Sequence, residues 1–133
     1  IIDRISDVQS TKIKSGFGGT VGNKGAVLIR FCLDDTSIVV ANCHLESGQK
    51  KEKERVQQMK EIITTAFSEK SSKYSYMQHD IKIFFGDLNF RVNLPYFTVL
   101  DIIDNMTHDN YAEQLETLLN NDQLIQYRLD YSW

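Results

Sequence analysis

The chain has 133 residues, of which 41% are hydrophobic and 25% are charged. This length allows one hydrophobic core and favours a single unit, and the composition is that of a folded protein rather than a disordered segment. The formal net charge of -3 excludes an overall basic field of the kind that binds nucleic acids or anionic membranes non-specifically, so an anionic ligand must be bound locally.

Residues 4–14 alternate apolar and polar side chains through Ile5, Val8 and Ile13, which predicts an extended strand. The next segment is rich in glycine, because five of the seven glycines of the chain lie within residues 16–25. The strand is therefore expected to lead into a turn or loop.

Two apolar, β-favouring runs follow at residues 26–33 and 37–45, separated by an acidic turn at 34–35. This pattern predicts an antiparallel hairpin. Asn42 and His44 are two positions apart near the end of the second run, so they are expected to share a face at the far end of the hairpin.

Residues 51–69 carry apolar side chains at helical spacing, which predicts an amphipathic helix. The polar stretch 71–79 predicts a surface loop. Bulky residues at 81–85 then predict a short buried strand that ends at Gly86. Two short helices are expected around 97–104 and 111–119. Since strands and helices alternate, the fold class is α/β or α+β.

The two cysteines, Cys32 and Cys43, lie in predicted strands, which favours reduced core thiols over a disulfide and agrees with a cytosolic protein. No apolar run reaches the roughly 18 residues that span a bilayer, and no signal peptide is recognisable. The sequence begins without Met and ends on aromatic residues at 131–133. Both ends are therefore expected to be cut from a longer protein.

The segment 84–91, Phe-Phe-Gly-Asp-Leu-Asn-Phe-Arg, places polar side chains just beyond a predicted strand, where sheets position their sites. Asp87 and Asn89 would both project toward one ligand if the chain stayed extended, offering an acceptor for a water or metal and a donor for a phosphoryl oxygen. An Asx turn after Gly86 explains the same residues without chemistry.

His44 also lies at a strand end, where an imidazole can donate to a phosphoryl oxygen or protonate a leaving group. A single histidine in this position is more often a satisfied core residue, so both interpretations stay open. His79 and His108 fall in polar loops and are weaker candidates.

The glycine-rich segment could present backbone N–H groups to a phosphate, with side-chain donors from Asn23 and Lys24. A P-loop is excluded, because a strand follows and no Gly-Lys-Ser/Thr ending is present. A flexible turn beside the hairpin is the alternative. The mixed charges at 50–55 are typical of a solvated helix start.

Three segments in order carry a family resemblance. They are 14–19 continued through 22–27 and 29–31; 42–45 with 48–49 and 54–55; and 84–91 followed by Leu94-Pro95. A weaker match to the family is Asp122-Gln123-Leu124. Together they resemble the inositol polyphosphate 5-phosphatase family of the DNase I-like endonuclease-exonuclease-phosphatase superfamily, closest to its synaptojanin-like branch. Phe84 stands where many members have Trp, which changes packing rather than chemistry.

The resemblance implies that residues 1–133 form the central part of one catalytic domain. It implies a four-layer α/β/β/α sandwich with mostly antiparallel mixed sheets and outer helices. It also implies Mg²⁺ as cofactor and removal of the 5-phosphate from phosphoinositides, such as phosphatidylinositol 4,5-bisphosphate, or from soluble inositol polyphosphates. The resemblance further implies a cytoplasmic enzyme that contacts membranes peripherally through its substrate. Nucleic acid is not an expected partner.

By the same resemblance, Asp87 would align or activate the attacking water, and Asn89 would support that water and the metal. His44 would stabilise the phosphoryl oxygens, while Asn23 and Lys24 would lie near the substrate. The remaining supporting residues would be Arg55 and Arg91. These roles suit phosphoryl transfer, which needs charge neutralisation and positioning more than covalent chemistry.

The family also uses an upstream Glu that binds the metal, a downstream Pro-Ala-Trp-Cys-Asp-Arg segment that reads a neighbouring ring phosphate, and a final Asp-His pair. This sequence contains none of the three. We therefore expect the 133-residue chain to be inactive by itself. Two alternatives stay open: a nuclease or sphingomyelinase of the same superfamily, and a non-catalytic interaction module that keeps the scaffold.

Overall fold

The computed structural model describes residues 2–15, 23–68 and 74–130. The chain forms two compact units, Ile1–Asn89 and Phe90–Trp133, and each is described by itself. The tip of the glycine-rich segment, residues 16–22, lies outside the described residues, as do residues 69–73.

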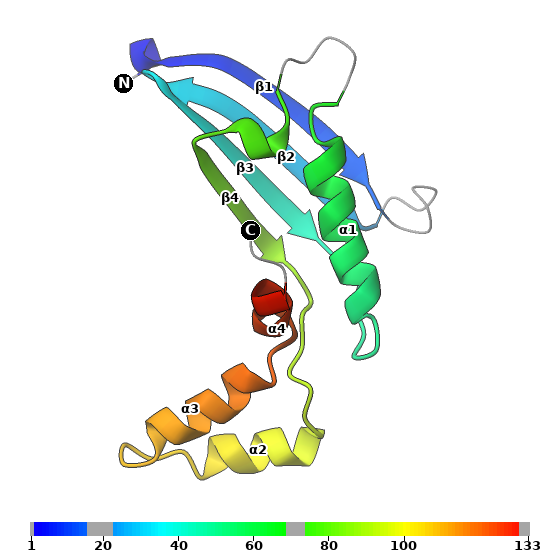
Figure 1. Ribbon diagram of the computed structural model, residues 1–133, viewed down its shortest axis with the longest axis vertical. Helices are drawn as coiled ribbons and strands as arrows, with labels where there is room; N and C mark the ends of the chain where they lie inside the picture. The colour runs from blue at the N-terminus through cyan, green and yellow to red at the C-terminus, as the bar shows by residue number, and fades with distance from the viewer. Residues whose placement is uncertain (1, 16–22, 69–73, 131–133) are drawn as a thin grey trace. The chain divides into compact units, whose positions relative to one another are not determined.

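A four-stranded sheet forms the body of the first unit (Figure 1). The strands are β1 (Ile5–Lys14), β2 (Gly25–Leu33), β3 (Thr36–His44) and β4 (Ile81–Asp87), in that spatial order, after a short 3-10 turn η1 (Ile2–Arg4). The first three strands are antiparallel neighbours, whereas β4 runs parallel to β3. The predicted strands and the hairpin are confirmed.

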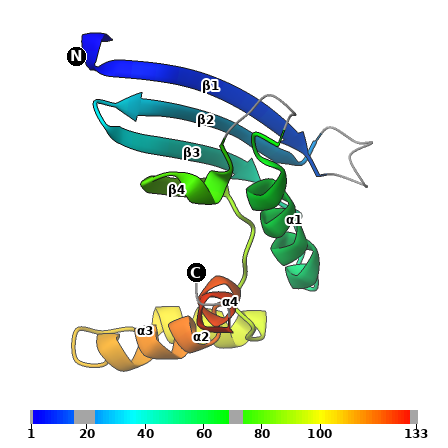
Figure 2. The ribbon, with the colours of Figure 1, turned by 45° about the horizontal axis from the view of Figure 1, so that its top comes forward.

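Helix α1 (Glu52–Thr65) lies against one face of this sheet (Figure 2). The core on that side contains Leu28 and Val39 from the sheet and Ile62 from the helix, all fully buried. The predicted amphipathic helix is confirmed, but it ends earlier than expected. Phe67 adopts a positive φ of 59°, a left-handed conformation that a continuing helix does not use.

The opposite face of the sheet is apolar and exposed. Ile29 on β2 and Ile81, Ile83 and Phe85 on β4 are each 44–47% exposed. The prediction that residues 81–85 form a buried strand was therefore wrong for this face. Apolar residues on both sides of a strand indicate two covered faces, and the described residues cover only one.

The segment before β4 also differs from the prediction. A polar surface loop was expected at 71–79, yet Tyr76, in the 3-10 turn η3 (Tyr76–Gln78), and His79 are buried. The ring of His79 accepts a hydrogen bond at Nε2 from Arg30 Nε, 2.9 Å away. The guanidinium of Arg30 is itself fully buried, lies 3.8 Å from the centroid of the Tyr74 ring and forms an ion pair with Asp7. The segment is therefore buried because it supplies His79 as a polar partner to the buried charge of Arg30.

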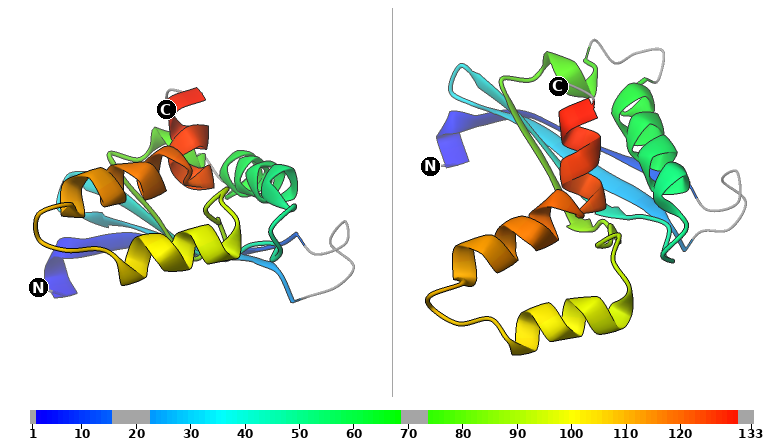
Figure 3. Two further views of the ribbon diagram at one scale, coloured as in Figure 1. Left: turned by 90° about the horizontal axis from the view of Figure 1, so that it is seen from below. Right: turned by 60° about the horizontal axis from the view of Figure 1, so that its bottom comes forward.

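Within its described residues, 90–130, the second unit contains three helices (Figure 3). They are α2 (Tyr96–Asp104), α3 (Tyr111–Asn120) and α4 (Gln123–Asp130). The first two confirm the expected helices, whereas α4 was not predicted. Backbone hydrogen bonds fix its start, because Gln123 N donates to the carbonyl oxygen of Arg91 at 3.0 Å.

Both cysteines are free; Cys43 is a buried core thiol as expected, whereas Cys32 is half-buried. None of the helices in the described part of the chain has the length and apolarity needed to cross a membrane.

Candidate active site

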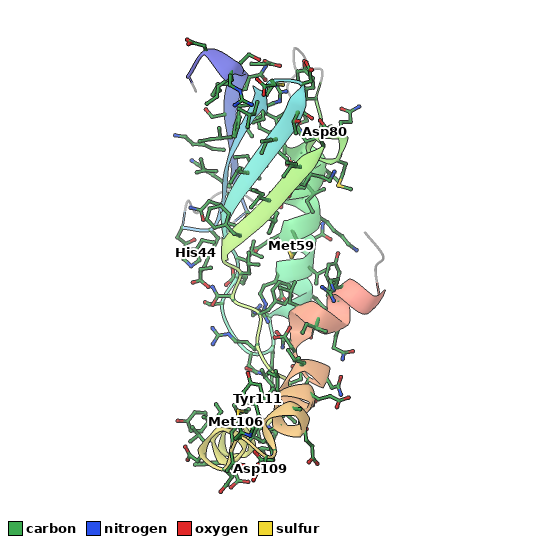
Figure 4. The ribbon with its side chains drawn as sticks, turned by 90° about the vertical axis from the view of Figure 1, so that its left-hand side faces the viewer. His44, Met59, Asp80, Met106, Asp109 and Tyr111 are labelled. Atoms are coloured by element: carbon green, nitrogen blue, oxygen red, sulfur yellow. The ribbon has the colours of Figure 1, made fainter. Side chains whose placement is uncertain are left out.

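The candidate site lies where the parallel strands β3 and β4 end. His44 and Asp87 are the last residues of these strands and are register partners. The carboxyl ends of parallel neighbours meet at one edge of a sheet, so an imidazole and a carboxylate from distant sequence positions become adjacent. Figure 4 shows His44 at this end of the sheet and Asp80, which precedes β4, at the opposite end.

Gly86 allows this close approach of the two strands. Its φ is 122°, in a region that side chains rarely adopt, and a Cβ atom here would lie 2.1 Å from the carbonyl oxygen of Cys43. The same Cβ atom would lie 2.7 Å from Oδ1 of Asn42. A glycine directly before Asp87 is therefore required by packing, which gives the Gly-Asp pair a structural reason in addition to any chemical one.

The ring of His44 has two charged neighbours. Lys24 Nζ lies 2.7 Å from His44 Nε2, and Asp87 Oδ2 lies 3.5 Å from the same nitrogen. An ammonium group can only donate, so the Lys24 contact requires an unprotonated Nε2. The Asp87 contact becomes favourable when Nε2 carries a proton. Lys24 and Asp87 thus stabilise opposite protonation states of one ring nitrogen.

Asn89 follows β4 in a left-handed conformation, with φ of 56°. Its side-chain Nδ2 donates to the carbonyl oxygen of Leu45 at 3.1 Å, while Leu45 N donates to the carbonyl oxygen of Asp87 at 2.9 Å. The condition under which Asp87 and Asn89 would project together, an extended chain, is not met, because the strand ends at Asp87. The carboxamide instead ties the end of β4 to the residue after His44.

Arg55 is fully buried in α1 and holds the turn after β3. Its Nη1 donates to the carbonyl oxygens of Glu46 at 3.1 Å and Gly48 at 2.8 Å. The neighbouring Gln58 accepts from the backbone N of Glu46 at 2.8 Å. Sequence analysis named Arg55 but missed Gln58. The available signal was its position three residues after Arg55, on the helix side that carries Met59 and Ile62.

Cys43 lies between Asn42 and His44 but is unsuited to nucleophilic chemistry. Burial raises the pKa of its thiol to about 12. It therefore stays protonated near neutral pH, and the thiolate is the nucleophilic form.

Asn23 and Lys24 precede β2 and line a hollow beside His44. Arg91 belongs to the second unit, so its supporting role stays a prediction. Its backbone N donates to the side-chain oxygen of Gln123 at 2.9 Å. Of the two other histidines, His79 is buried, whereas His108 is exposed and belongs to the second unit.

Asp87 and Asn89 offer some of the oxygen ligands that a hard divalent cation would need. Among the residues described, no group of three or more His, Cys, Asp or Glu side chains could hold a metal. The carboxylate of Asp87 is 63% exposed at the strand end, and Asn89 supplies a nearby carboxamide. Mg²⁺ is commonly held by one or two carboxylates together with waters and substrate phosphate oxygens. The donors present fit an oxygen-seeking divalent cation that takes further ligands from elsewhere.

An exposed imidazole–carboxylate pair with a neighbouring lysine therefore lies at the ends of β3 and β4. A family model described as "Endonuclease/Exonuclease/phosphatase family 2" matches residues 1–130. The chain therefore belongs to the endonuclease/exonuclease/phosphatase family.

The similar curated proteins carry the names of 5-phosphatases. A "Probable inositol polyphosphate 5-phosphatase" of Schizosaccharomyces pombe is 35% identical over 136 residues, covering 92% of this chain and 11% of that protein. The human "Phosphatidylinositol 3,4,5-trisphosphate 5-phosphatase 1" is 36% identical over 129 residues, covering 95% of this chain and 10% of that protein. This chain thus spans only about a tenth of the curated relatives it matches.

A solved structure shares the fold. It is the inositol polyphosphate 5-phosphatase domain of SPsynaptojanin in complex with inositol (1,4)-bisphosphate and a calcium ion. The TM-score is 0.80 at 31% identity, with 97% of this chain and 34% of that chain covered. The predicted family resemblance, its synaptojanin-like character and the mixed α/β fold class are confirmed.

Proposed function

We propose that the protein carrying this chain is a Mg²⁺-dependent phosphomonoesterase. Its substrates are phosphoinositides, such as phosphatidylinositol 4,5-bisphosphate, or soluble inositol polyphosphates, and it removes their 5-phosphate. The observation that carries the proposal is the register pairing of His44 with Asp87, with Lys24 Nζ 2.7 Å from the imidazole. The names of the similar proteins support the substrate class.

Each of these residues has a part in phosphoryl transfer. Asp87 accepts a proton or a hydrogen bond from the attacking water. Lys24 moves from His44 to a phosphoryl oxygen when the substrate binds, because a phosphate attracts an ammonium more strongly than a neutral imidazole does. His44 Nε2, with a proton taken from solvent, donates to another phosphoryl oxygen. The water oxygen bonds to phosphorus as the bond to the ring oxygen breaks, and the proton that Asp87 takes from the water passes to that oxygen, which leaves as the inositol hydroxyl.

Asp87 and Asn89 would hold the cation together with ligands from outside this chain. A bound Mg²⁺ supplies charge neutralisation at the phosphoryl oxygens. Arg55 and Asn89 keep the two strand ends in place, and Asn23 adds a donor beside the substrate. Arg91 is proposed to support the site from the second unit.

We also propose that residues 1–133 form the central part of one catalytic domain and are inactive alone. The match to about a third of the solved domain supports this proposal. We further propose that the protein is cytoplasmic and contacts membranes through its lipid substrate.

Phosphate release from phosphatidylinositol 4,5-bisphosphate, with and without Mg²⁺, tests the function in the complete gene product. Asp87→Ala and His44→Ala should each lower kcat by about 100-fold or more while the protein stays folded. Lys53→Ala, on the exposed side of α1, is the matched control and should keep full activity. A folded wild type that releases no phosphate but cleaves DNA would replace the proposal with the nuclease alternative.

A further inference from the structure

Gln58 connects two segments of the chain that hold residues of the candidate site. This residue lies in α1 and is buried, with 7% of its surface exposed. Its Oε1 accepts a hydrogen bond from Glu46 N at 2.8 Å, and its Nε2 donates to the carbonyl oxygen of Ser15 at the longer distance of 3.4 Å. A backbone N–H only donates and a carbonyl oxygen only accepts, so these partners fix the orientation of the carboxamide.

The two residues that Gln58 binds are neighbours of His44 and Lys24. Glu46 follows His44 by two positions in the chain. Ser15 N donates to the carbonyl oxygen of Lys24 at 3.1 Å. The side chain of the same lysine places Nζ 2.7 Å from His44 Nε2. One buried carboxamide therefore links the backbone of Lys24, through Ser15, to the turn after His44.

Pairing within the sheet does not provide this link. The β2–β3 ladder ends with the pair Gly25 and His44, and Lys24 and Glu46 both lie beyond it. His44 has register partners on both neighbouring strands, Gly25 and Asp87. Lys24 precedes the first residue of β2. Its position therefore depends more than that of His44 on contacts from outside the sheet.

The carboxamide of Gln58 contributes more to position than to stability. A buried amide costs free energy unless its polar groups are hydrogen-bonded, whereas an apolar side chain of similar size has no such requirement. Met59 and Ile62, on the same helix, are buried and apolar. An apolar residue would therefore suit position 58 as well for packing, but it would not specify where the two bound segments lie.

We infer that Gln58 is a positioning residue for phosphoryl transfer. This role rests on the proposed function, in which Lys24 moves from His44 to a phosphoryl oxygen. Gln58 holds the backbone of Lys24 where its ammonium group reaches both partners. It acts through Lys24 and does not itself touch the reacting atoms.

The test measures kcat and KM of the complete gene product for Gln58→Met, alone and combined with Lys24→Met. Methionine keeps the length of the side chain and removes both hydrogen bonds. Gln58→Met should lower kcat about tenfold and change KM less than about twofold, because a small displacement of Lys24 weakens mainly its contact in the transition state. Combined with Lys24→Met, the same substitution should lower kcat less than about twofold, since the group that Gln58 positions is then absent.

Two further variants serve as controls. Ile62→Val removes one methylene from the core beside α1 but no hydrogen bond, and it should keep the kcat of wild type. Gln58→Leu is a second apolar variant in case Gln58→Met does not fold, and it should show the same loss of kcat. Four results would overturn the inference: an unchanged kcat, an equal loss with and without Lys24→Met, a similar loss in Ile62→Val, or failure of both Gln58 variants to fold.

Chemical labelling of Lys24 separates this inference from the proposed function. If wild type releases no phosphate, the proposed function fails, and the rate at which acetic anhydride modifies Lys24, followed by mass spectrometry, still tests the link. Lys24 is half-buried, so loosening of its backbone should expose it. Labelling about threefold faster in Gln58→Met than in wild type and Ile62→Val supports the inference. Equal rates overturn it.

Discussion

At the scale of single residues, the candidate site depends on backbone geometry as much as on its reactive side chains. Gly86 brings β4 against the carbonyl oxygen of Cys43, Asn89 turns the chain with a positive φ, and its side chain binds the carbonyl oxygen of Leu45. These contacts fix the position of Asp87 beside His44. The backbone and packing contacts of Gly86 and Asn89 therefore determine whether the proposed chemistry is possible.

Gly86→Ala should be far more destabilising than a comparable glycine substitution. Gly48 also has a positive φ, of 112°, but a Cβ atom there would first meet the flexible side chain of Lys51 at 3.3 Å. We expect Gly48→Ala to cost about 1–2 kcal/mol from backbone strain alone, and Gly86→Ala about 3 kcal/mol or more because strain and backbone collision add. Calorimetric melting of the complete gene product measures both. Equal losses for the two variants would contradict the collision.

The strand-end positions of the candidate residues could be predicted from the sequence at this scale, whereas their catalytic roles stay a prediction. His44 and Asp87 fell at the ends of recognisable apolar runs, and the structure makes them register partners. The direction of Asn89 was not predictable, since a left-handed Asn and an extended Asn have the same sequence pattern. The burial of His79 could not be predicted from the sequence for a different reason. Its partner, Arg30, is 49 residues away in the chain.

At the scale of elements, polar contacts connect strands that are distant in sequence. Asp80 precedes β4, and its Oδ2 accepts hydrogen bonds from Ser37 N at 2.8 Å and Ser37 Oγ at 2.6 Å at the start of β3. This contact joins the two parallel strands at the end opposite His44 (Figure 4). It helps to set the register that brings His44 and Asp87 together at the other end.

The Ser37 contact should make stability depend on pH in acid. Hydrogen bonds from the Ser37 hydroxyl and backbone hold the pKa of Asp80 below its ordinary value. A depressed folded-state pKa adds stability above the unfolded value of about 3.9, and this stability is lost as pH falls through the folded-state pKa. Asp80→Asn should thus lower the melting temperature at pH 7, and the difference from wild type should shrink below about pH 4.

The control for this effect is Asp35→Asn, in the exposed turn between β2 and β3. Melting curves of the complete gene product between pH 2 and pH 7 make the comparison. A difference between wild type and Asp80→Asn that stays constant with pH would show that the carboxylate charge contributes nothing to the contact.

At the scale of the whole molecule, the sheet of the first unit leaves one face open among the described residues. The sheet face that carries Val27, Ile29, Ile83 and Phe85 is exposed, although its composition is that of a core. Apolar surface of this kind normally meets another layer. This chain covers 34% of the solved neighbour, and we propose that a further part of the complete gene product covers this face.

Ile29→Thr combined with Ile83→Thr should therefore have opposite effects in two settings. In the isolated 133-residue chain, the pair should reduce self-association, measured by light scattering, because less apolar surface is exposed. In the complete gene product it should cost about 2 kcal/mol or more, because both side chains are then buried. Met77→Thr, in η3, is the exposed control. Unchanged stability of the complete protein would mean that this face stays open.

The parallel pairing of β3 with β4 also has a consequence for the order of folding. The β2–β3 hairpin joins residues that are close in sequence, so Lys24 and His44 can become neighbours early. His44 and Asp87 are 43 positions apart and meet only after α1 has formed and the crossover has closed. We expect the reactive pair to be among the last contacts made and among the first lost when the chain opens. An enzyme built in this way loses its activity before it loses its hairpin.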